Sequence, residues 1–336
     1  MGRPSISIII PTYNSSRSLE ECLRSISAQD YPAEKVEIIM VDAGSTDTTL
    51  EIASRTGVTK ILPNPLKTGE AGKAVGIDAA SGEIIALIDS DNVLDGTDWL
   101  SKMVLPFDNP DIAWTECYAL TYRPEDSALD RYCSLLGMND PIHLFLGNYD
   151  RLSTLTGKWT GLPVAATDRG DYYEVILDKE TIPTMGANGC LIRKEAVSSV
   201  DYKPYYFDID VTYQLVCNGY NRIGVVKKGI VHLYCPDLRT FARKQRRRIS
   251  DFLHYKKRGT RKYPHQRYFW GYVKFVASCI LVFPLLVQSL LGYARKNDSA
   301  WFIHPVACWL TLIIYSWVTI KSLFKTSELD RSTWSQ

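Results

Sequence analysis

The chain has 336 residues, of which 46% are hydrophobic and 23% are charged, and its formal net charge is +2. This apolar fraction is enough for one large or two medium-sized cores, and a nearly neutral chain is not expected to bind nucleic acid through its overall charge. The eight cysteines include no Cys-x-x-Cys pair, which argues against a disulfide framework or a zinc site and favours reduced thiols.

The first part of the chain alternates between short apolar runs and helical patterns. Ser5–Ile10 is typical of a buried strand, and Pro11–Asn14 follows it as a loop. A helical stripe then places apolar residues at Leu19, Cys22, Leu23 and Ile26. Val36–Val41 is a second strand candidate, and the turn Asp42–Asp47 caps a helix that we expect to begin near Thr48. Strands that alternate with helices in this way predict a parallel sheet.

A third apolar run, Glu83–Asp91, ends in two carboxylates. Asp89 and Asp91 are separated by one residue, so in an extended strand their side chains point to the same side. The carboxyl end of a central strand is where open α/β sheets bind ligands. Two adjacent carboxylates repel each other unless a cation lies between them, and hard oxygen ligands suit Mg²⁺ or Mn²⁺. We therefore expect these two carboxylates to converge on a metal ion.

Three spaced motifs resemble a known family, and they occur in the order SIIIPTYN, EIIMVDAGSTDTT and GKAVGIDAASGEIIALIDSDN. Together they resemble the nucleotide-sugar half of family 2 glycosyltransferases, over about residues 5 to 100. This resemblance implies the GT-A fold, an α/β domain with a Rossmann-like, mostly parallel sheet.

The same resemblance implies a set of donor-binding residues, which are Pro11, Tyr13, Asp42, Lys73, Asp89 and Asp91. The first three would hold the nucleotide base and ribose, Lys73 would lie near the base, and the last two would hold ribose and the metal-bound diphosphate. Helix capping is the alternative for Asp42 and for Asp47. Asp78 stands where the family commonly has Asn, so no role is carried over to that position.

Two later segments resemble the acceptor half of the family. Met185–Lys194 resembles its glycine-containing segment, in which Gly186 would let the backbone approach a sugar closely. The family's acidic motif follows, but Phe207 replaces its usual leading Glu. By position Asp208 matches the catalytic base. Capping of the next helix is the alternative for Asp208 and for Asp210.

Three more residues are candidates further along the chain. His232 follows two short strand candidates, and GT-A enzymes often use a late His as a metal ligand, whereas a hydrogen-bonded structural His is the alternative. Gln245–Ile249 resembles a degraded Gln-x-x-Arg-Trp motif of processive polysaccharide synthases, without the Trp. This departure argues against processivity, but Gln245 and Arg248 remain candidates for binding diphosphate or acceptor.

Two uncharged stretches, Phe275–Ala294 and Ser299–Ile320, are each long enough to cross a hydrocarbon core about 30 Å thick. The short connector Arg295–Asp298 would join them as a hairpin. The preceding Arg239–Arg267 contains twelve Lys or Arg and one acid, which predicts that both ends of the hairpin face the cytoplasm. A pair of buried helices in a soluble domain is the alternative.

The basic block also carries apolar residues at helical spacing, namely Leu238, Phe241, Ile249, Phe252 and Leu253. This pattern predicts an amphipathic helix that lies on the bilayer surface, and a solvated basic helix is the alternative.

These features predict a GT-A domain over residues 1–237, a basic interface segment over 238–267 and a transmembrane hairpin over 268–325. Within the first, we expect a nucleotide-sugar half at 1–115, an insertion without a recognisable motif at 116–184 and an acceptor half at 185–237.

The predicted activity is that of an inverting, Mg²⁺- or Mn²⁺-dependent glycosyltransferase with its catalytic domain on the cytoplasmic face of a prokaryotic cell membrane. It would move a sugar from a UDP- or GDP-linked donor to a hydroxyl of a membrane-embedded lipid or lipid-linked acceptor. A polyprenyl-phosphate glycosyltransferase is the alternative, because its acceptor is already an anion and needs no base. A catalytically inactive membrane adaptor with the same fold is a third. The sequence leaves the sugar and the oligomeric state open.

Overall fold

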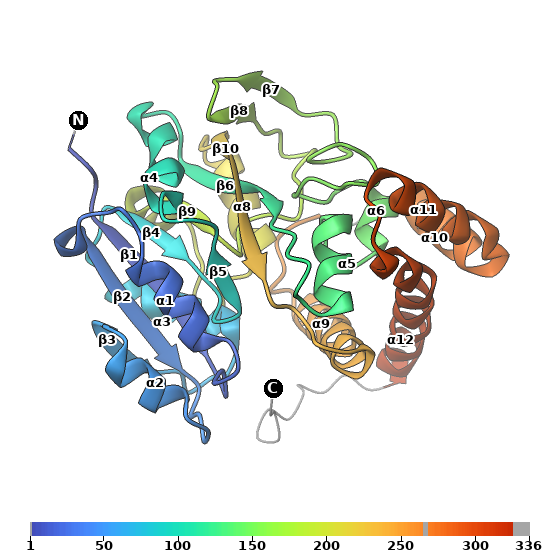
Figure 1. Ribbon diagram of the computed structural model, residues 1–336, viewed down its shortest axis with the longest axis horizontal. Helices are drawn as coiled ribbons and strands as arrows, with labels where there is room; N and C mark the ends of the chain where they lie inside the picture. Colours follow the sequence, from blue (N-terminus) through green and yellow to red (C-terminus); the bar gives the residue numbers. More distant parts are fainter. Residues whose placement is uncertain (1, 265–267, 325–336) are drawn as a thin grey trace. The chain divides into compact units, whose positions relative to one another are not determined.

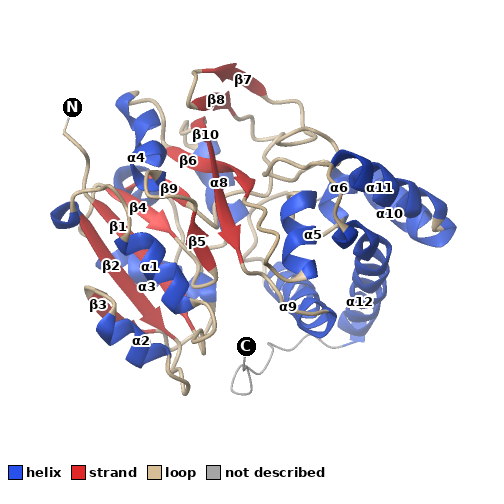
Figure 2. Cartoon of the chain, viewed as in Figure 1, coloured by secondary structure: helices blue, strands red, loops and turns tan. Residues whose placement is uncertain are grey.

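The computed structural model describes residues 2–264 and 268–324, and its contacts divide the chain into two compact units. Of the described residues, unit 1 contains 2–121 and 163–232, and unit 2 contains 122–162 and those from 233 to 324. Figure 1 follows the chain by colour, and Figure 2 separates its helices from its strands. The stretch 116–184, which the sequence groups as one insertion, is thus shared between the units.

Unit 1 contains all of the named strands. They are β1 (Ile6–Thr12), β2 (Val36–Asp42), β3 (Lys60–Pro63), β4 (Ile84–Leu87), β5 (Asn92–Leu94), β6 (Trp114–Leu120), β7 (Ala165–Asp168), β8 (Tyr172–Ile176), β9 (Cys190–Arg193) and β10 (Arg222–His232). Its helices are α1 (Leu19–Ser27), α2 (Thr49–Arg55), α3 (Gly69–Ala79), α4 (Trp99–Val104), α7 (Lys194–Ser198) and α8 (Asp208–Cys217), with the 3₁₀ turns η1 (Ala33–Lys35) and η2 (Leu105–Asp108).

Over the described residues these strands form one ten-stranded sheet in the order β3-β2-β1-β4-β9-β6-β10-β8-β7, with β5 paired to β10. β1 to β4 pair in parallel, as do β6 and β10. The pairs that involve β5, β7, β8 and β9 are antiparallel. The sheet is therefore mixed rather than mostly parallel, because the parallel pattern of the first hundred residues does not continue through the rest of unit 1.

The predicted strands and helix at the start of the chain are confirmed, but the loop predicted to begin at Pro11 is wrong for Pro11 and Thr12, which continue β1 beside β2. β1 is buried along its whole length, with β2 on one side and β4 on the other. α1 buries the four residues of the predicted stripe, Leu19, Cys22, Leu23 and Ile26. These side chains join the largest apolar cluster of unit 1, so burial of this face, rather than helix propensity alone, stabilises the helix.

Unit 2 is helical in its described part. Its elements are α5 (Ala128–Leu136), α6 (Ile142–Leu146), α9 (Leu238–Lys257), α10 (Phe269–Leu281), α11 (Phe283–Arg295), η4 (Ser299–Ile303) and α12 (His304–Phe324). The predicted amphipathic helix is confirmed as a helix by α9. Lys325 and residues 265–267 of the predicted basic segment and hairpin lie outside the described residues.

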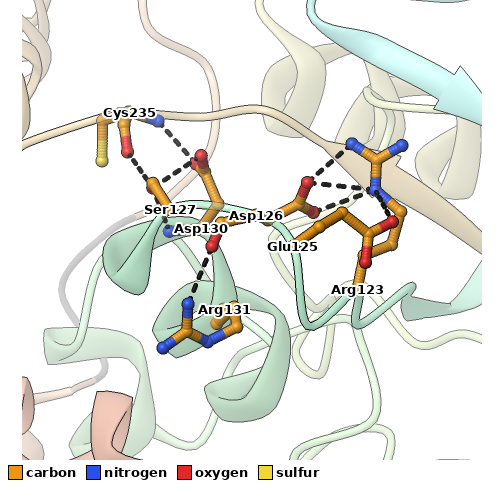
Figure 3. A network of polar contacts seen from close by, with 7 residues as sticks. All are labelled: Arg123, Glu125, Asp126, Ser127, Asp130, Arg131 and Cys235. Atoms are coloured by element: carbon orange, nitrogen blue, oxygen red, sulfur yellow. Dashed lines mark hydrogen bonds and ion pairs between the residues drawn. The ribbon is translucent and has the colours of Figure 1, made fainter.

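A polar network fixes the start of α5 (Figure 3). Ser127 caps the helix by accepting from the backbone N–H of Asp130 over 3.1 Å, and its hydroxyl donates to the Cys235 carbonyl over 2.9 Å. The backbone N–H of Cys235 donates to Asp130 over 2.8 Å. Beside them, Arg123 forms a 2.7 Å ion pair with Asp126. The two hydrogen bonds to Cys235 join segments of unit 2 that are about a hundred residues apart in the chain.

The predicted first membrane span is not one straight helix. The chain breaks at Val282, whose φ is 61°, and α10 and α11 are bent by 94° relative to each other. Pro284 lies in the first turn of α11, where its missing N–H costs nothing, whereas inside a continuous helix it would remove a hydrogen bond and clash with the preceding turn. The second predicted stretch is continuous: Ser299–Leu323 is long and apolar enough to cross a membrane.

Candidate active site

The carboxyl ends of β1 and β2 form one side of the candidate site in unit 1. Their register places Thr12 beside Asp42, and the Thr12 hydroxyl donates to Asp42 Oδ1 over 3.0 Å. Asp42 Oδ2 accepts from the backbone N–H groups of Gly44 and Ser45 at 2.9 and 2.8 Å. Asp42 therefore anchors the turn after β2, and its contact with a nucleotide stays a prediction.

Two residues of the predicted donor site, Pro11 and Tyr13, and the capping candidate Asp47 lie on or near the same turn. Pro11 is buried within β1, and Tyr13 follows the strand half-buried. Asp47 Oδ1 accepts from the backbone N–H of Thr49 over 3.0 Å at the start of α2. Asp47 thus has the capping role that the sequence left as its alternative.

Asp89 and Asp91 lie on a turn after β4, not on the strand itself. Asn92 fixes this turn, because its Oδ1 accepts from the Asp89 N–H and its own N–H donates to the Asp89 carbonyl, each over 2.9 Å. The two carboxylates consequently have different partners: Asp89 lies 3.7 Å from Lys73, and Asp91 lies 3.4 Å from His232. The expected extended strand through Asp89 and Asp91 is therefore wrong, and the convergence of both carboxylates on one metal ion stays a prediction.

Lys73, on α3, is a buried cation between two carboxylates. Its Nζ lies 3.1 Å from Asp208 Oδ1 and 3.7 Å from Asp89 Oδ1, and its side chain is only 6% exposed. Burial by itself would lower the pKa of Lys73, but the negative charges of Asp208 and Asp89 outweigh it and raise the pKa. Lys73 is therefore protonated at neutral pH, and its charge links the turn after β4 to the start of α8.

Asp208 is the first residue of α8, and its side chain is 33% exposed. Its pKa is raised to about 6, first because the surrounding protein excludes water and further because Asp89 is negative, while Lys73 acts in the opposite direction. A carboxyl group with a pKa near 6 is mostly ionised at neutral pH and is a better proton acceptor than an ordinary Asp. Asp210, the other acidic candidate, is buried within α8.

Asp91 and His232 meet although 140 residues separate them in the sequence, since β5 and β10 pair antiparallel next to them. Asp91 Oδ1 and His232 Nε2 are 3.4 Å apart. Two ligands at right angles on an ion about 2.1 Å away are about 3 Å apart, so this pair fits a shared divalent ion. The described residues contain no cluster of three or more His, Cys, Asp or Glu that could hold a metal ion.

Glu116 and Gly186 shape the other side of Asp208, and Glu116 was not predicted. Gly186 has a φ of +105°, and a Cβ added there would lie 3.1 Å from the Asp208 carbonyl. The buried Glu116, on β6, accepts from the Gly186 N–H over 2.9 Å. The Gly186 backbone therefore lies against the start of α8, where Glu116 holds it, and its close approach to a sugar stays a prediction. The sequence signals Glu116 only as a charge inside an apolar strand.

Gln245 and Arg248 belong to unit 2, on α9. Gln245 is fully buried, and its amide donates to the Asn139 carbonyl over 2.9 Å. Arg248 is half-buried and lies 3.4 Å from the buried carboxylate of Asp140. These contacts give both residues a structural role, and their binding of diphosphate or acceptor stays a prediction.

The first part of the chain is similar in sequence to known proteins. Residues 7–136 match the sequence profile of Glycosyl transferase family 2. Glycosyltransferase AglE of Haloferax volcanii is 38% identical over 93 residues, which cover 26% of this chain and 31% of the relative. The chain thus spans about a third or less of the first curated relatives that it matches.

Two solved structures share the fold. Mannosyltransferase PcManGT of Pyrobaculum calidifontis, solved with GDP-Man and Mn²⁺, has a TM-score of 0.53 and 17% identity over 94% of this chain and 88% of its own. Glucosyl-3-phosphoglycerate synthase of Mycobacterium tuberculosis, solved with Mn²⁺ and UDP-Glc, has a TM-score of 0.50 and 18% identity over 78% of this chain and 81% of its own. Residues 7–136 are therefore similar to Glycosyl transferase family 2, in a chain that combines a mixed-sheet α/β domain of the GT-A kind with C-terminal helices.

Proposed function

We propose that the chain is an inverting glycosyltransferase that moves one sugar from a nucleotide sugar to a hydroxyl of a membrane-embedded lipid or lipid-linked acceptor. The observation that carries the proposal is the ion-pair cluster in which the buried Lys73 lies between the half-buried Asp89 and Asp208, so that a predicted donor residue adjoins a carboxylate with a pKa of about 6. Such a cluster supports a site in which a proton acceptor stands beside a bound donor.

In the proposed reaction, the acceptor oxygen attacks the anomeric carbon as the bond from that carbon to the donor phosphate breaks. The electron pair of the broken bond leaves with the nucleoside diphosphate. Asp208 accepts the proton of the attacking hydroxyl, because that oxygen is a poor nucleophile while the proton remains. Attack opposite the leaving group inverts the anomeric configuration. Lys73 keeps Asp208 ionised and in place.

Asp91 and His232 would hold a divalent ion, either Mg²⁺ or Mn²⁺, whose charge stabilises the departing diphosphate when it is bound. The carboxylate and imidazole ligands suit this class of ion, and the structural neighbours were solved with Mn²⁺ and with GDP-Man or UDP-Glc. Pro11, Tyr13, Asp42, Lys73 and Asp89 would contact the base, ribose and phosphates. We accordingly assign a UDP- or GDP-linked donor.

The C-terminal helices support a membrane acceptor. α10, α11 and α12 present large exposed apolar side chains, among them Trp270, Leu290 and Trp317. α9 is strongly basic, and anionic headgroups attract such a helix. The catalytic unit would accordingly work at the cytoplasmic face of the cell membrane, and the acceptor would be a lipid.

A polyprenyl-phosphate acceptor is the second candidate. The replacement of the usual Glu by Phe207 favours it, because an anionic acceptor needs no proton removed and can dispense with an acidic motif. An inactive adaptor is disfavoured by the intact ion-pair cluster around Lys73.

Activity on a panel of UDP- and GDP-sugars with membrane lipid extracts, read by mass spectrometry, tests the proposal. We expect one nucleotide sugar to give a lipid product heavier by one sugar residue. An enzymatic role would be contradicted if the protein showed no sugar transfer and no donor hydrolysis with any of these donors.

A further inference from the structure

The two ends of the α10–α11 pair are held by the same polar segment of unit 2, residues 122–162. At the start of α10, Gly271 packs so closely that an added Cβ would lie 2.8 Å from Leu146, and the rings of Phe275 and Phe145 meet edge to face at 5.3 Å. At the end of α11, the Arg295 guanidinium donates to the Thr154 carbonyl over 3.1 Å. The pair therefore leaves this segment and returns to it.

The connector after α11 is held to the same segment by charge. Asp298 forms a 2.9 Å ion pair with Arg131 and accepts from the Tyr122 hydroxyl over 2.7 Å. Segment 122–162 carries nine charged residues and the capped start of α5 (Figure 3). A compact segment with these charges cannot extend through the hydrocarbon of a bilayer, so the two ends of the helix pair lie on the same side of it.

The dimensions of the pair agree with a return to one side. Each helix has 13 residues and is about 20 Å long, which is too short to cross about 30 Å of hydrocarbon. With the 94° bend at Val282, the tip lies about 14 Å from the line that joins the two ends, which is roughly the depth of one leaflet. The residues at the tip are strongly exposed and apolar: Ile280 is 68%, Leu281 67% and Phe283 71% exposed.

α12 also stays beside polar groups along its course. At its first residue, His304 Nδ1 lies 2.8 Å from the Tyr132 hydroxyl. Eleven residues later, the Tyr315 hydroxyl donates to Gln245 on α9 over 3.1 Å and to Asp140. A helix that crossed the bilayer from its first residue would carry Tyr315 more than 15 Å away from the interface, and α9 with its many arginines would have to follow it.

The outer side of α12 is a single apolar stripe at helical spacing, formed by Val306, Trp309, Ile313, Trp317 and Ile320. This stripe is what a helix lying in the interface presents to lipid.

We propose that unit 2 enters only one leaflet of a lipid bilayer. α10 and α11 form a re-entrant wedge whose tip reaches mid-membrane, α12 lies in the interface on its apolar stripe, and the arginines of α9 meet anionic headgroups. This inference rests on the proposed membrane association. It adds that no described segment crosses to the side of the bilayer opposite the catalytic unit. A lipid acceptor would consequently be reached from one leaflet, without a channel.

The test maps the connector in inside-out vesicles that contain the full chain with Cys217→Ser, which removes the exposed thiol. Asn297→Cys reports the connector, and Glu51→Cys, on the exposed side of α2, marks the catalytic side. We expect an impermeant maleimide to label both to the same extent before detergent is added. In addition, a bimane probe at Ile280→Cys should be quenched most by lipids that carry a spin label near mid-bilayer.

The outcomes separate this inference from the proposed function. If Asn297→Cys is labelled only after detergent while Glu51→Cys is labelled before it, the pair spans the bilayer, and the single-leaflet insertion is refuted while membrane association stands. Suppose instead that high salt washes the full chain from the vesicles and that no spin-labelled lipid quenches the Ile280→Cys probe. Both the single-leaflet insertion and the membrane association are then refuted.

Discussion

Lys73 connects the predicted donor residue Asp89 with the predicted base Asp208, since its single charge is shared between the two carboxylates. The carboxyl pKa of Asp208 is raised to about 6, so the base is lost to protonation as the pH falls below this value. For the wild-type protein we expect kcat/KM to fall about tenfold per pH unit below about pH 6, if Asp208 is the base. A rate that is level down to pH 4 would contradict this assignment.

Replacing Lys73 by Met should shift the acidic limb of the pH–rate profile to higher pH. Lys73 lowers the pKa of Asp208, so its loss leaves the carboxyl easier to protonate, and activity should begin to fall at a higher pH than in the wild type. Lys73→Arg keeps the charge and serves as the control, with a limb close to that of the wild type. A merely structural role would reduce activity at every pH without moving the limb.

The pairing of Asp91 with His232 predicts a metal dependence of donor binding. Asp91→Asn or His232→Ala should weaken the effect of Mn²⁺ on binding of UDP or GDP by roughly tenfold or more, because even residues behind metal ligands contribute this much. Asp171→Asn, an exposed carboxylate paired with Lys102, is the matched control. Titration calorimetry with and without chelator measures the difference, and equal binding in excess chelator would refute the metal site.

At the scale of elements, α9 combines a buried side at Phe241 and Gln245 with exposed arginines at 246 and 247. Neutralising both arginines to Gln should weaken binding to anionic vesicles by roughly 30-fold, at about 1 kcal/mol for each basic residue near the surface. Donor hydrolysis should persist. Lys35→Gln, on η1 of unit 1, is the control variant, and loss of donor hydrolysis together with vesicle binding would instead place these arginines at the diphosphate.

The elements that the sequence predicted well are those specified by local periodicity. β1, β2 and α1 each have an apolar pattern whose period matches their structure. The end of β4 was predicted incorrectly because the Asn92 side chain bonds to the backbone of Asp89 and turns the chain there. The size of the bend at Val282 does not follow from an uncharged run of twenty residues, which shows only its length, whereas Pro284 is a residue type that kinks or begins helices and stands in the first turn of α11.

The candidate site was predicted only where the family motifs name residues. Asp91 and His232 were expected separately as metal ligands, and their meeting depends on the antiparallel pairing of β5 with β10. Glu116 could not be found in the same way. Its bond to Gly186 joins residues 70 positions apart, and a single charged residue in a strand gives no sign of such a partner.

At the scale of the whole molecule, the chain leaves unit 1 after Thr121 and returns to it at Pro163. The excursion supplies segment 122–162, which holds α10, α11 and the connector before α12. Sequence alone could not reveal this arrangement, because these partners are more than a hundred residues apart. In the proposed function, segment 122–162 gives the membrane-facing helices a polar support.

The central claim is that Asp208 removes the proton of an acceptor hydroxyl in a nucleotide-sugar-dependent transfer. The most direct test is the turnover of Asp208→Asn beside that of the wild type, with donor affinity measured on the same samples. The account predicts unchanged donor affinity and a kcat lower by roughly 10²-fold or more, since a positioned base contributes about 10²- to 10⁴-fold. Near-normal turnover of the variant, with a polyprenyl-phosphate sugar as the product, would contradict the account and establish the second candidate instead.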